Sequence, residues 1–387
     1  MKFITFVDYL KLGKVRLIIS HKLKNNKKIL ICPLNWGLGH AARCVPIINM
    51  LINEGAEVII ASENNPLAFL KLEFPQLRFI EFKGYDINYG NKKNIALKMV
   101  LSIPKILYGI YKEHKKLDKI IKVNNIDIVI SDNRFGCWNK KIKSIYITHQ
   151  VMIKSTKYLK FIEPVLHNIH KYFINKFDEC WIPDINEGIS LSGDLSHKYT
   201  LPIPYYYIGI LSRFTSDESN LASANLNYLY DLMIIVSGPE PQRSIFEDLI
   251  LSQLKDTDLR VVIVRGKPDS DEEVSHLNKN VIIYSHLNTN KFKDILIRSA
   301  KVICRSGYST LMDLAVFGKQ AILVPTSGQT EQEYLANYHY HQKHYYYMLQ
   351  KDFNINNAII NSEGYNGLRI AIDTSLLKER TQRMLKR

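Results

Sequence analysis

The chain has 387 residues, 46% of them hydrophobic, which is too apolar for a disordered protein and long enough for two globular domains. Its five cysteines lack the paired spacing of a zinc site or a disulfide framework, so we expect reduced thiols in a cytoplasmic protein. The formal net charge of +15 attracts anionic partners, but no nucleic-acid-binding module accompanies it, and we predict no nucleic-acid partner.

Residues 1–27 form a basic N-terminal extension in which lysine and arginine far outnumber acidic residues. Phe3, Phe6, Val7 and Leu10 share one helical face, a pattern typical of a helix lying on a membrane surface, with a packed surface helix as the alternative. No stretch approaches the ~18 uninterrupted apolar residues of a membrane-spanning helix. We therefore expect at most a peripheral association with the inner face of a membrane.

Beyond this extension, short β-branched runs alternate with longer helical stretches. The first set of strands is expected at 28–32, 57–61, 126–132, 143–148 and 178–183. After a polar stretch at 215–227, a second set is expected at 231–238, 260–266, 280–285, 301–305 and 320–325. Strands that alternate with helices indicate parallel βαβ units. We therefore predict an α/β fold of two Rossmann-like domains, 28–212 and 226–361, followed by a C-terminal helix at 362–387.

Polar residues follow several of these strands, at the edge where open parallel sheets bind their ligands. In the first domain, His40 lies in the turn GLGH, Asp132 ends the third strand, and His149 follows the fourth. The positive end of a helix dipole keeps a histidine neutral, so we predict His40 as a general base, with His149 and Asp132 as alternatives. A histidine that caps the turn or binds phosphate passively is the other interpretation of His40.

The loop RSGYST carries the strongest signal in the second domain. Gly307 permits a tight turn, and the helix after it is predicted to end at Gly318. Free N–H groups at the start of that helix, with the hydroxyls of Ser309 and Thr310, would bind a phosphate, although an ordinary capped turn is the alternative. Asp313, one turn further on, is placed to reach a ribose hydroxyl.

Two further loops follow strands of the second domain. In SGPEPQR, Pro241 suits a first helical position and leaves Arg243 to face an anion. In TSGQTEQE, Thr330 and Glu333 match a capping box, which leaves Glu331 and Gln332 to bind hydroxyls.

Other interpretations of single motifs remain open at this point. GLGHAA followed by Glu63 also fits a dinucleotide-binding turn, which would make the protein an NAD- or FAD-dependent oxidoreductase. A non-catalytic sugar-binding protein would keep the same fold. The D-x-D motif at 269–271 lies in a very polar loop, and the histidines at 339 and 341 do not share a helical face, so we predict no metal site.

Together these motifs resemble the GT-B glycosyltransferases, specifically glycosyltransferase family 28, whose MurG-like members act in peptidoglycan synthesis. The resemblance runs from about residue 28 to residue 346 and is carried by GLGH and by CRSGYSTLMDLAVFGKQAILVPTSGQTEQEYLA. The motifs SDNRFG, ITHQ and SGPEPQR are shared with a group of bacterial glycosyltransferase-like proteins. The resemblance implies two domains facing across a cleft and an inverting, metal-independent enzyme without a cofactor, whose donor is a nucleotide sugar, typically UDP-linked.

The family also implies which residues contact each substrate. Gly307, Ser309 and Thr310 would hold the diphosphate, Asp313 the ribose and Gln332 the sugar. The full donor-side set is Ser237, Gly238, Arg243, Arg305, Ser306, Gly307, Ser309, Thr310, Asp313, Gln329, Glu331 and Gln332. The acceptor, an envelope glycolipid or glycan, would lie against the first domain near Gly37, Gly39, Arg43, Asn133, Arg134 and Gln150.

The stretch 92–122 mixes apolar side chains with nine lysines and two acidic residues. In the acceptor-binding domain it would form a cationic, partly apolar helical face that docks on anionic membrane. A solvated helix whose lysines aid solubility is the alternative.

Overall fold

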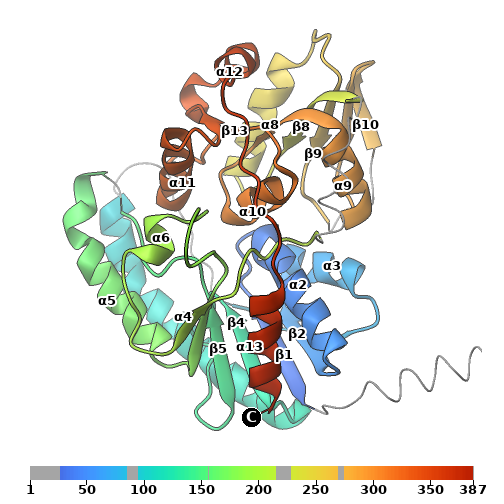
Figure 1. Ribbon diagram of the computed structural model, residues 1–387. Coiled ribbons are helices and arrows are strands. Elements are labelled where there is room, and N and C mark those ends of the chain that lie inside the picture. The colour runs from blue at the N-terminus through green and yellow to red at the C-terminus, as the bar shows by residue number, and fades with distance from the viewer. Residues whose placement is uncertain (1–26, 85–94, 156, 215–227, 269–273, 387) are drawn as a thin grey trace, which may run out of the picture.

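The computed structural model describes residues 27–84, 95–155, 157–214, 228–268 and 274–386. The basic N-terminal extension, apart from its last residue, and the D-x-D motif lie outside the described residues. Two seven-stranded sheets divide the chain, one in each half of the molecule (Figure 1).

The first sheet has the order β3-β2-β1-β4-β5-β6-β7, and every pairing in it is parallel. Its strands are β1 (Lys28–Pro33), β2 (Glu57–Ser62), β3 (Arg78–Glu81), β4 (Ile128–Asp132), β5 (Lys143–Ile147), β6 (Glu179–Ile182) and β7 (Tyr205–Tyr207). The five predicted strands are confirmed. The prediction missed the two edge strands, β3 and β7, because they are short and lack the continuous apolar run of a strand covered on both faces.

The second sheet has the order β10-β11-β9-β8-β12-β13-β14. Its strands are β8 (Tyr230–Ile235), β9 (Val261–Val264), β10 (Val274–Asn278), β11 (Val281–Tyr284), β12 (Ser299–Cys304), β13 (Ala321–Leu323) and β14 (Tyr346–Tyr347). All five predicted strands are confirmed here too. This sheet is not wholly parallel, because the exposed edge strand β10 runs antiparallel to β11.

Helices cover both faces of each sheet. In the first half they are α2 (Leu38–Asn53), α3 (Asn64–Glu73), α4 (Ile95–Asn124), the 3-10 helix η1 (Lys157–Ile162), α5 (Glu163–Ile174) and α6 (Asp194–His197). In the second half they are α8 (Gln242–Gln253), α9 (Thr289–Arg298), α10 (Tyr308–Phe317), α11 (Thr330–His341), η2 (Gln350–Asp352) and α12 (Ile355–Asn361). The last helix, α13 (Ser375–Lys386), returns to the first half and packs beside α2, where Gln382 bonds Glu54 at 3.0 Å (Figure 1).

Two predicted helix signals have different outcomes. Gly318 ends α10 in the left-handed conformation, with φ of 60°, so the predicted C-cap is confirmed. The predicted capping box is wrong, because α11 begins at Thr330 itself and Gln329 is its N-cap. The Thr330 hydroxyl bonds the Lys154 carbonyl, and Glu333 instead accepts a hydrogen bond from the Gly328 N–H at 2.8 Å.

Among the helices in the described ranges, none is both long enough and apolar enough to span a membrane.

Candidate active site

The carboxyl ends of β1, β4 and β5 bring the three predicted catalytic residues together. His40 lies in the first turn of α2, directly after β1, and Asp132 is the last residue of β4. His149 follows β5 by two residues. Because neighbouring parallel strands end at the same edge of the sheet, these side chains converge although up to 109 positions separate them in the sequence.

Arg43, one turn after His40 on α2, joins the three residues. Its Nε donates to Asp132 Oδ2 at 2.7 Å, and its Nη2 donates to Asp132 Oδ1. Its Nη1 lies 2.8 Å from Nδ1 of His149, and its Nη2 lies 2.9 Å from Nδ1 of His40. We predicted Arg43 only as an acceptor-side residue, whereas it is the centre of the cluster.

Asp132 is held in its charged form. The carboxylate is fully buried, and burial alone would raise its pKa. The charges and hydrogen bonds of Arg43 and His40 outweigh burial and hold the pKa of Asp132 well below its usual range. A buried, permanently ionised carboxylate does not accept a proton near neutral pH, so Asp132 is suited to orient a base rather than to be one.

His40 keeps one ring nitrogen available. Its Nδ1 lies 3.1 Å from Asp132 Oδ1, and no hydrogen bond within the described residues involves its Nε2. The side chain is 15% exposed, against 4% for His149. Among the three predicted catalytic residues, His40 therefore has the free acceptor atom that a general base requires.

His149 uses both of its ring nitrogens in contacts. Its Nε2 lies 2.8 Å from Oε1 of Glu331, on the first turn of α11, and its ring stacks on Tyr308 with 4.1 Å between the ring centres. Burial lowers the pKa of His149, so the ring is neutral near pH 7. Both Glu331 and Tyr308 belong to the second half of the chain, and the stacking by Tyr308 was not predicted.

Two helices present uncapped N-termini to each other beside this cluster. Gly37 precedes α2 with φ of 90°, and Gly307 precedes α10; neither helix start has a side-chain cap. The Ser309 hydroxyl donates to the Gly39 carbonyl at 2.8 Å. A Cβ on Gly39 would lie 3.0 Å from Ser309 Oγ, so this close approach favours glycine. The positive ends of both helix dipoles meet here, which suits a bound anion.

The structure corrects the prediction that Arg305 and Arg243 face an anion. Arg305 is buried, and its guanidinium bonds the carbonyls of Val324 and Gln242 and stacks on Phe246. Burial lowers the pKa of Arg305 to about 10. Arg243 pairs with Glu240 at 2.7 Å and with Glu247 at 2.6 Å. Arg243 is therefore paired with two carboxylates, while Arg305 bonds backbone carbonyls through Nη1 and Nη2 and its Nε has no hydrogen bond within the described residues.

Three further donor-side residues make contacts within the protein. Asp313 accepts a hydrogen bond from Ser212 and pairs with Arg213, both in the segment leading out of the first half. The Ser306 hydroxyl donates to the Gln332 carbonyl at 2.7 Å, and Gln332 Oε1 accepts from the Thr326 N–H at 2.9 Å. The predicted contacts of Asp313 with the ribose and of Gln332 with the sugar stay predictions.

On the acceptor side, Arg134 is buried and pairs with Glu113 of α4 at 2.7 Å, so it does not face a substrate as predicted. Glu113 also accepts from the Gly136 N–H, and its role was not anticipated, because nothing in a helical lysine-rich stretch marks it as buried. Asn133 has a left-handed backbone with φ of 54° and accepts a hydrogen bond from Tyr146. The backbone N–H of Gln150 donates to Thr148.

The remaining predicted residues lie at strand ends without a contact that decides their role. Ser237 and Gly238 follow β8, Thr310 lies in the first turn of α10, and Gln329 precedes α11. All four are half-buried. Their roles in donor binding stay predictions.

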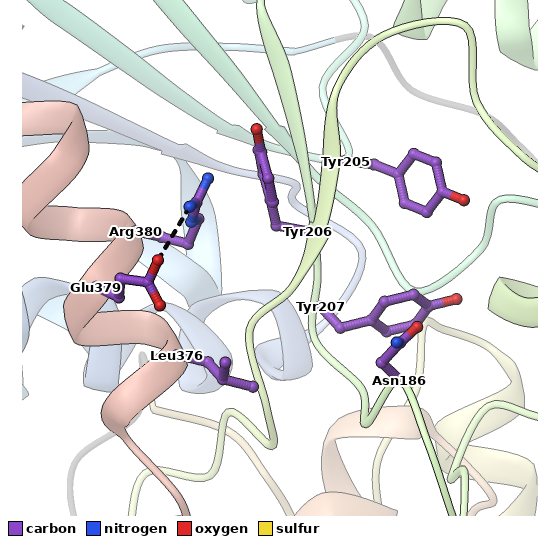
Figure 2. Close-up of a pocket in the computed structure, with 7 residues that line it drawn as sticks. All are labelled: Asn186, Tyr205, Tyr206, Tyr207, Leu376, Glu379 and Arg380. Carbon is purple, nitrogen blue, oxygen red and sulfur yellow. Dashed lines mark hydrogen bonds and ion pairs between the residues drawn. The ribbon is translucent and has the colours of Figure 1, made fainter.

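A groove of about 440 Å³ lies elsewhere, between the edge strand β7 and helix α13 (Figure 2). Its lining residues are Asn186, Tyr205, Tyr206, Tyr207, Leu376, Glu379 and Arg380. The Arg380 guanidinium lies 3.7 Å from the centre of the Tyr206 ring and pairs with Glu379 at 3.2 Å. No predicted site residue lines this groove, so we assign the active site to the cluster around Asp132.

Glu63 and the possible metal ligands bear on two alternatives that the sequence left open, a dinucleotide site and a metal site. Glu63, the residue that would bind a ribose in a dinucleotide site, accepts a hydrogen bond from the Gly84 N–H at 2.7 Å. Within the part of the chain that the structure describes, no three His, Cys, Asp or Glu side chains gather as metal ligands would.

Solved glycosyltransferases share this two-sheet architecture. A spinosyn rhamnosyltransferase, SpnG, aligns with a TM-score of 0.58 at 12% identity, covering 93% of this chain and 95% of its own. The glycosyltransferase of kitacinnamycin aligns with a TM-score of 0.57 at 12% identity, covering 94% of each chain. The fold is therefore GT-B, with two Rossmann-like halves, as predicted.

Sequence comparison finds similarity to glycosyltransferases. Residues 235–362 match the glycosyltransferase family 28 C-terminal domain. An uncharacterized glycosyltransferase of Methanosarcina acetivorans is 22% identical over 330 residues, covering 79% of each chain. A UDP-N-acetylglucosamine--N-acetylmuramyl-(pentapeptide) pyrophosphoryl-undecaprenol N-acetylglucosamine transferase of Sulfurihydrogenibium sp. is 27% identical over 113 residues, or 28% of this chain and 31% of that one. The chain is a glycosyltransferase of GT-B fold whose residues 235–362 are similar to the family 28 C-terminal domain, and the oxidoreductase alternative is not supported.

Proposed function

We propose that this glycosyltransferase moves a sugar from a UDP-sugar to an acceptor hydroxyl, with inversion and without a divalent metal. The observation that carries the proposal is the meeting of the α2 and α10 N-termini beside the His40–Asp132 pair. This arrangement supports the proposal because a site suited to an anionic leaving group lies beside a proton acceptor.

His40 acts as the general base in this proposal. Its Nδ1 can either donate to Asp132 or accept the second N–H of Arg43 Nη2, and only the first arrangement leaves Nε2 without a proton, as a general base requires. We therefore assign the proton to Nδ1, donated to Asp132, with Nε2 bare. The imidazolium that forms when Nε2 takes a proton is then stabilised by the buried carboxylate, as in a serine hydrolase triad.

The reaction is a single displacement. The acceptor hydroxyl gives its proton to His40 Nε2 while its oxygen forms a bond to the anomeric carbon of the sugar. The bond from that carbon to the diphosphate breaks, and UDP leaves with the electron pair. The free N–H groups of Ser309 and Thr310 and the two helix dipoles stabilise the charge that develops on the diphosphate.

A panel of UDP-, GDP- and dTDP-sugars tests this function, with UDP-N-acetylglucosamine first. In excess chelator, we expect the protein to bind UDP and to release it slowly from one UDP-sugar by hydrolysis. Addition of Mg²⁺ or Mn²⁺ should leave that rate unchanged, because helix N-termini supply the charge stabilisation. A protein that neither binds nor hydrolyses any donor contradicts the proposal, and binding of NAD in its place would revive the oxidoreductase alternative.

We propose that the acceptor is lipid-linked and that α4 and α5 form the membrane-facing surface. These two helices cover the same face of the first sheet, where residues of α4 and α5 enter its core. Large apolar side chains stay exposed along both helices and η1: Leu107, Tyr108, Tyr111, Phe161, Val165, Ile169 and Tyr172. Lysines accompany them, with the Lys112 ammonium over the Tyr108 ring and the Lys176 ammonium over the Tyr172 ring. Apolar anchors ringed by cations are typical of peripheral membrane binding.

The double variant Val165→Glu/Ile169→Glu should abolish co-sedimentation with vesicles that contain anionic lipid, because two carboxylates on this face oppose both burial and charge attraction. The wild type should bind anionic but not neutral vesicles, and binding should weaken at high salt. Each lysine near the surface contributes about 1 kcal/mol. UDP release from the soluble donor serves as the control and should not change. A wild type that stays in the supernatant throughout would point to a soluble acceptor.

A further inference from the structure

A continuous chain of contacts crosses from the second half of the molecule to the proposed base. It begins at Glu331 on α11, passes to His149 at 2.8 Å, and continues to Arg43 at 2.8 Å. From Arg43 it reaches Asp132 at 2.7 Å and then His40 at 3.1 Å. Of these five residues, Glu331 is the one from the second half of the molecule, and His40 is the proposed base.

The direction of the hydrogen bonds in this chain follows from Arg43. A guanidinium can only donate, so Nδ1 of His149 must be unprotonated, and its proton must sit on Nε2. The neutral ring therefore donates to the Glu331 carboxylate. Burial alone would raise the pKa of Glu331. The contacts with His149 and the charges of His40 and Arg43 outweigh burial and hold the pKa of Glu331 below its ordinary value.

The chain has little freedom to rearrange while the halves are in contact. Arg43, Asp132 and His149 are each at most 3% exposed, and the Tyr308 ring lies nearly parallel to His149, at 2°. Tyr308 is fixed in turn, since its hydroxyl donates to the Pro183 carbonyl at 2.7 Å. Oε2 of Glu331 makes no hydrogen bond to any residue that the structure describes, so it can accept one from a hydroxyl of the donor sugar.

We propose that Arg43 and His149 are positioning residues that transmit the docking of α11, through Glu331, to the orientation of His40. When Glu331 bonds His149, the His149 ring holds Arg43 in the position where Arg43 bonds Asp132. Asp132 in turn orients the ring of His40. The proposal rests on the proposed function for the role of His40, but the contact chain itself can be tested without activity. Its consequence is that the base is aligned only when the donor-binding half is in place.

The direct test is the protonation of the histidine rings, read by ¹⁵N NMR of histidine-labelled full-length protein near pH 7. In the wild type, His149 should show a proton on Nε2 and His40 a proton on Nδ1. Glu331→Ala should shift the ring signals of His149 and also those of His40, which Glu331 does not touch. The matched control is Glu333→Ala, which removes a carboxylate of the same helix that, among the described residues, bonds the Gly328 N–H alone, and it should shift neither. A Glu331→Ala spectrum in which His149 alone moves overturns the proposal.

A pair of His149 variants tests the same chain by kinetics, with UDP release from the UDP-sugar that the wild type hydrolyses. His149→Phe keeps the stacking on Tyr308 but loses both hydrogen bonds, and it should lower kcat by about tenfold to a hundredfold, the cost of a misplaced catalytic group. His149→Gln can accept from Arg43 and donate to Glu331, and it should recover most of that loss. UDP affinity, measured by calorimetry, should stay within about threefold in both, because the defect lies in the chemical step. Equal activity of the two variants contradicts the proposal. A wild type inactive on every donor defeats the proposed function, while the NMR result still decides the contact chain.

Discussion

His40→Ala is expected to lower kcat for UDP release by about a hundredfold or more, the usual cost of losing a general base. The physical reason is that neither of the other two predicted catalytic residues offers a free proton acceptor: Asp132 is buried and ionised, and both nitrogens of His149 are in contact with partners. Affinity for UDP should change by less than about threefold, since the base contacts the attacking hydroxyl and not the nucleotide.

The control for this variant is His276→Ala, which removes an exposed histidine from the edge strand β10. It should behave as the wild type in both turnover and UDP affinity. If His40→Ala retains turnover within about threefold, a general base contribution of the usual size is excluded at this position. The role would then pass to His149, which would have to release its contact with Glu331 to act.

Asp132→Asn is expected to lower kcat by about 10²- to 10⁴-fold, with the upper limit set by the equivalent change in a serine hydrolase triad. An amide in place of the carboxylate can donate to Nδ1 of His40, which would move the ring proton to Nε2 and block it as an acceptor. The change also leaves the buried Arg43 guanidinium without its counter-charge. Breaking a buried ion pair typically costs about 3–5 kcal/mol of stability.

Stability and catalysis can be separated with Glu113→Gln. Glu113 pairs with the buried Arg134 in the same half, so its loss should reduce stability by a similar mechanism. Because Glu113 contacts none of the three catalytic candidates, kcat should remain close to that of the wild type. Thermal unfolding and UDP release, measured on both variants at a temperature where both are folded, check this. Equal loss of kcat in the two variants would show that Asp132 acts only through stability.

The strands and the polar loops after them could be predicted from the sequence because their signals are local. Apolar runs of four to seven residues, glycine at tight turns and the alternation of strands with helices depend on near neighbours in the chain. All ten expected strands are present, and His40, Asp132 and His149 lie where strand ends place them. The short edge strands β3, β7, β10 and β14 escaped prediction because edge strands lack a continuous apolar run.

The partners of the charged residues were decided only by the tertiary structure. Arg43 and Asp132 are 89 residues apart, and His149 and Glu331 are 182 apart, so no local pattern joins them. The same holds for Arg305 and Asp313, which looked free to bind a donor but are neutralised or hydrogen-bonded by residues from other segments. Sequence determined which side chains stand at the strand ends, because periodicity and turn chemistry act over a few residues. Whether each charge is buried against a partner or left to face a substrate depends on long-range packing, which only the folded chain provides.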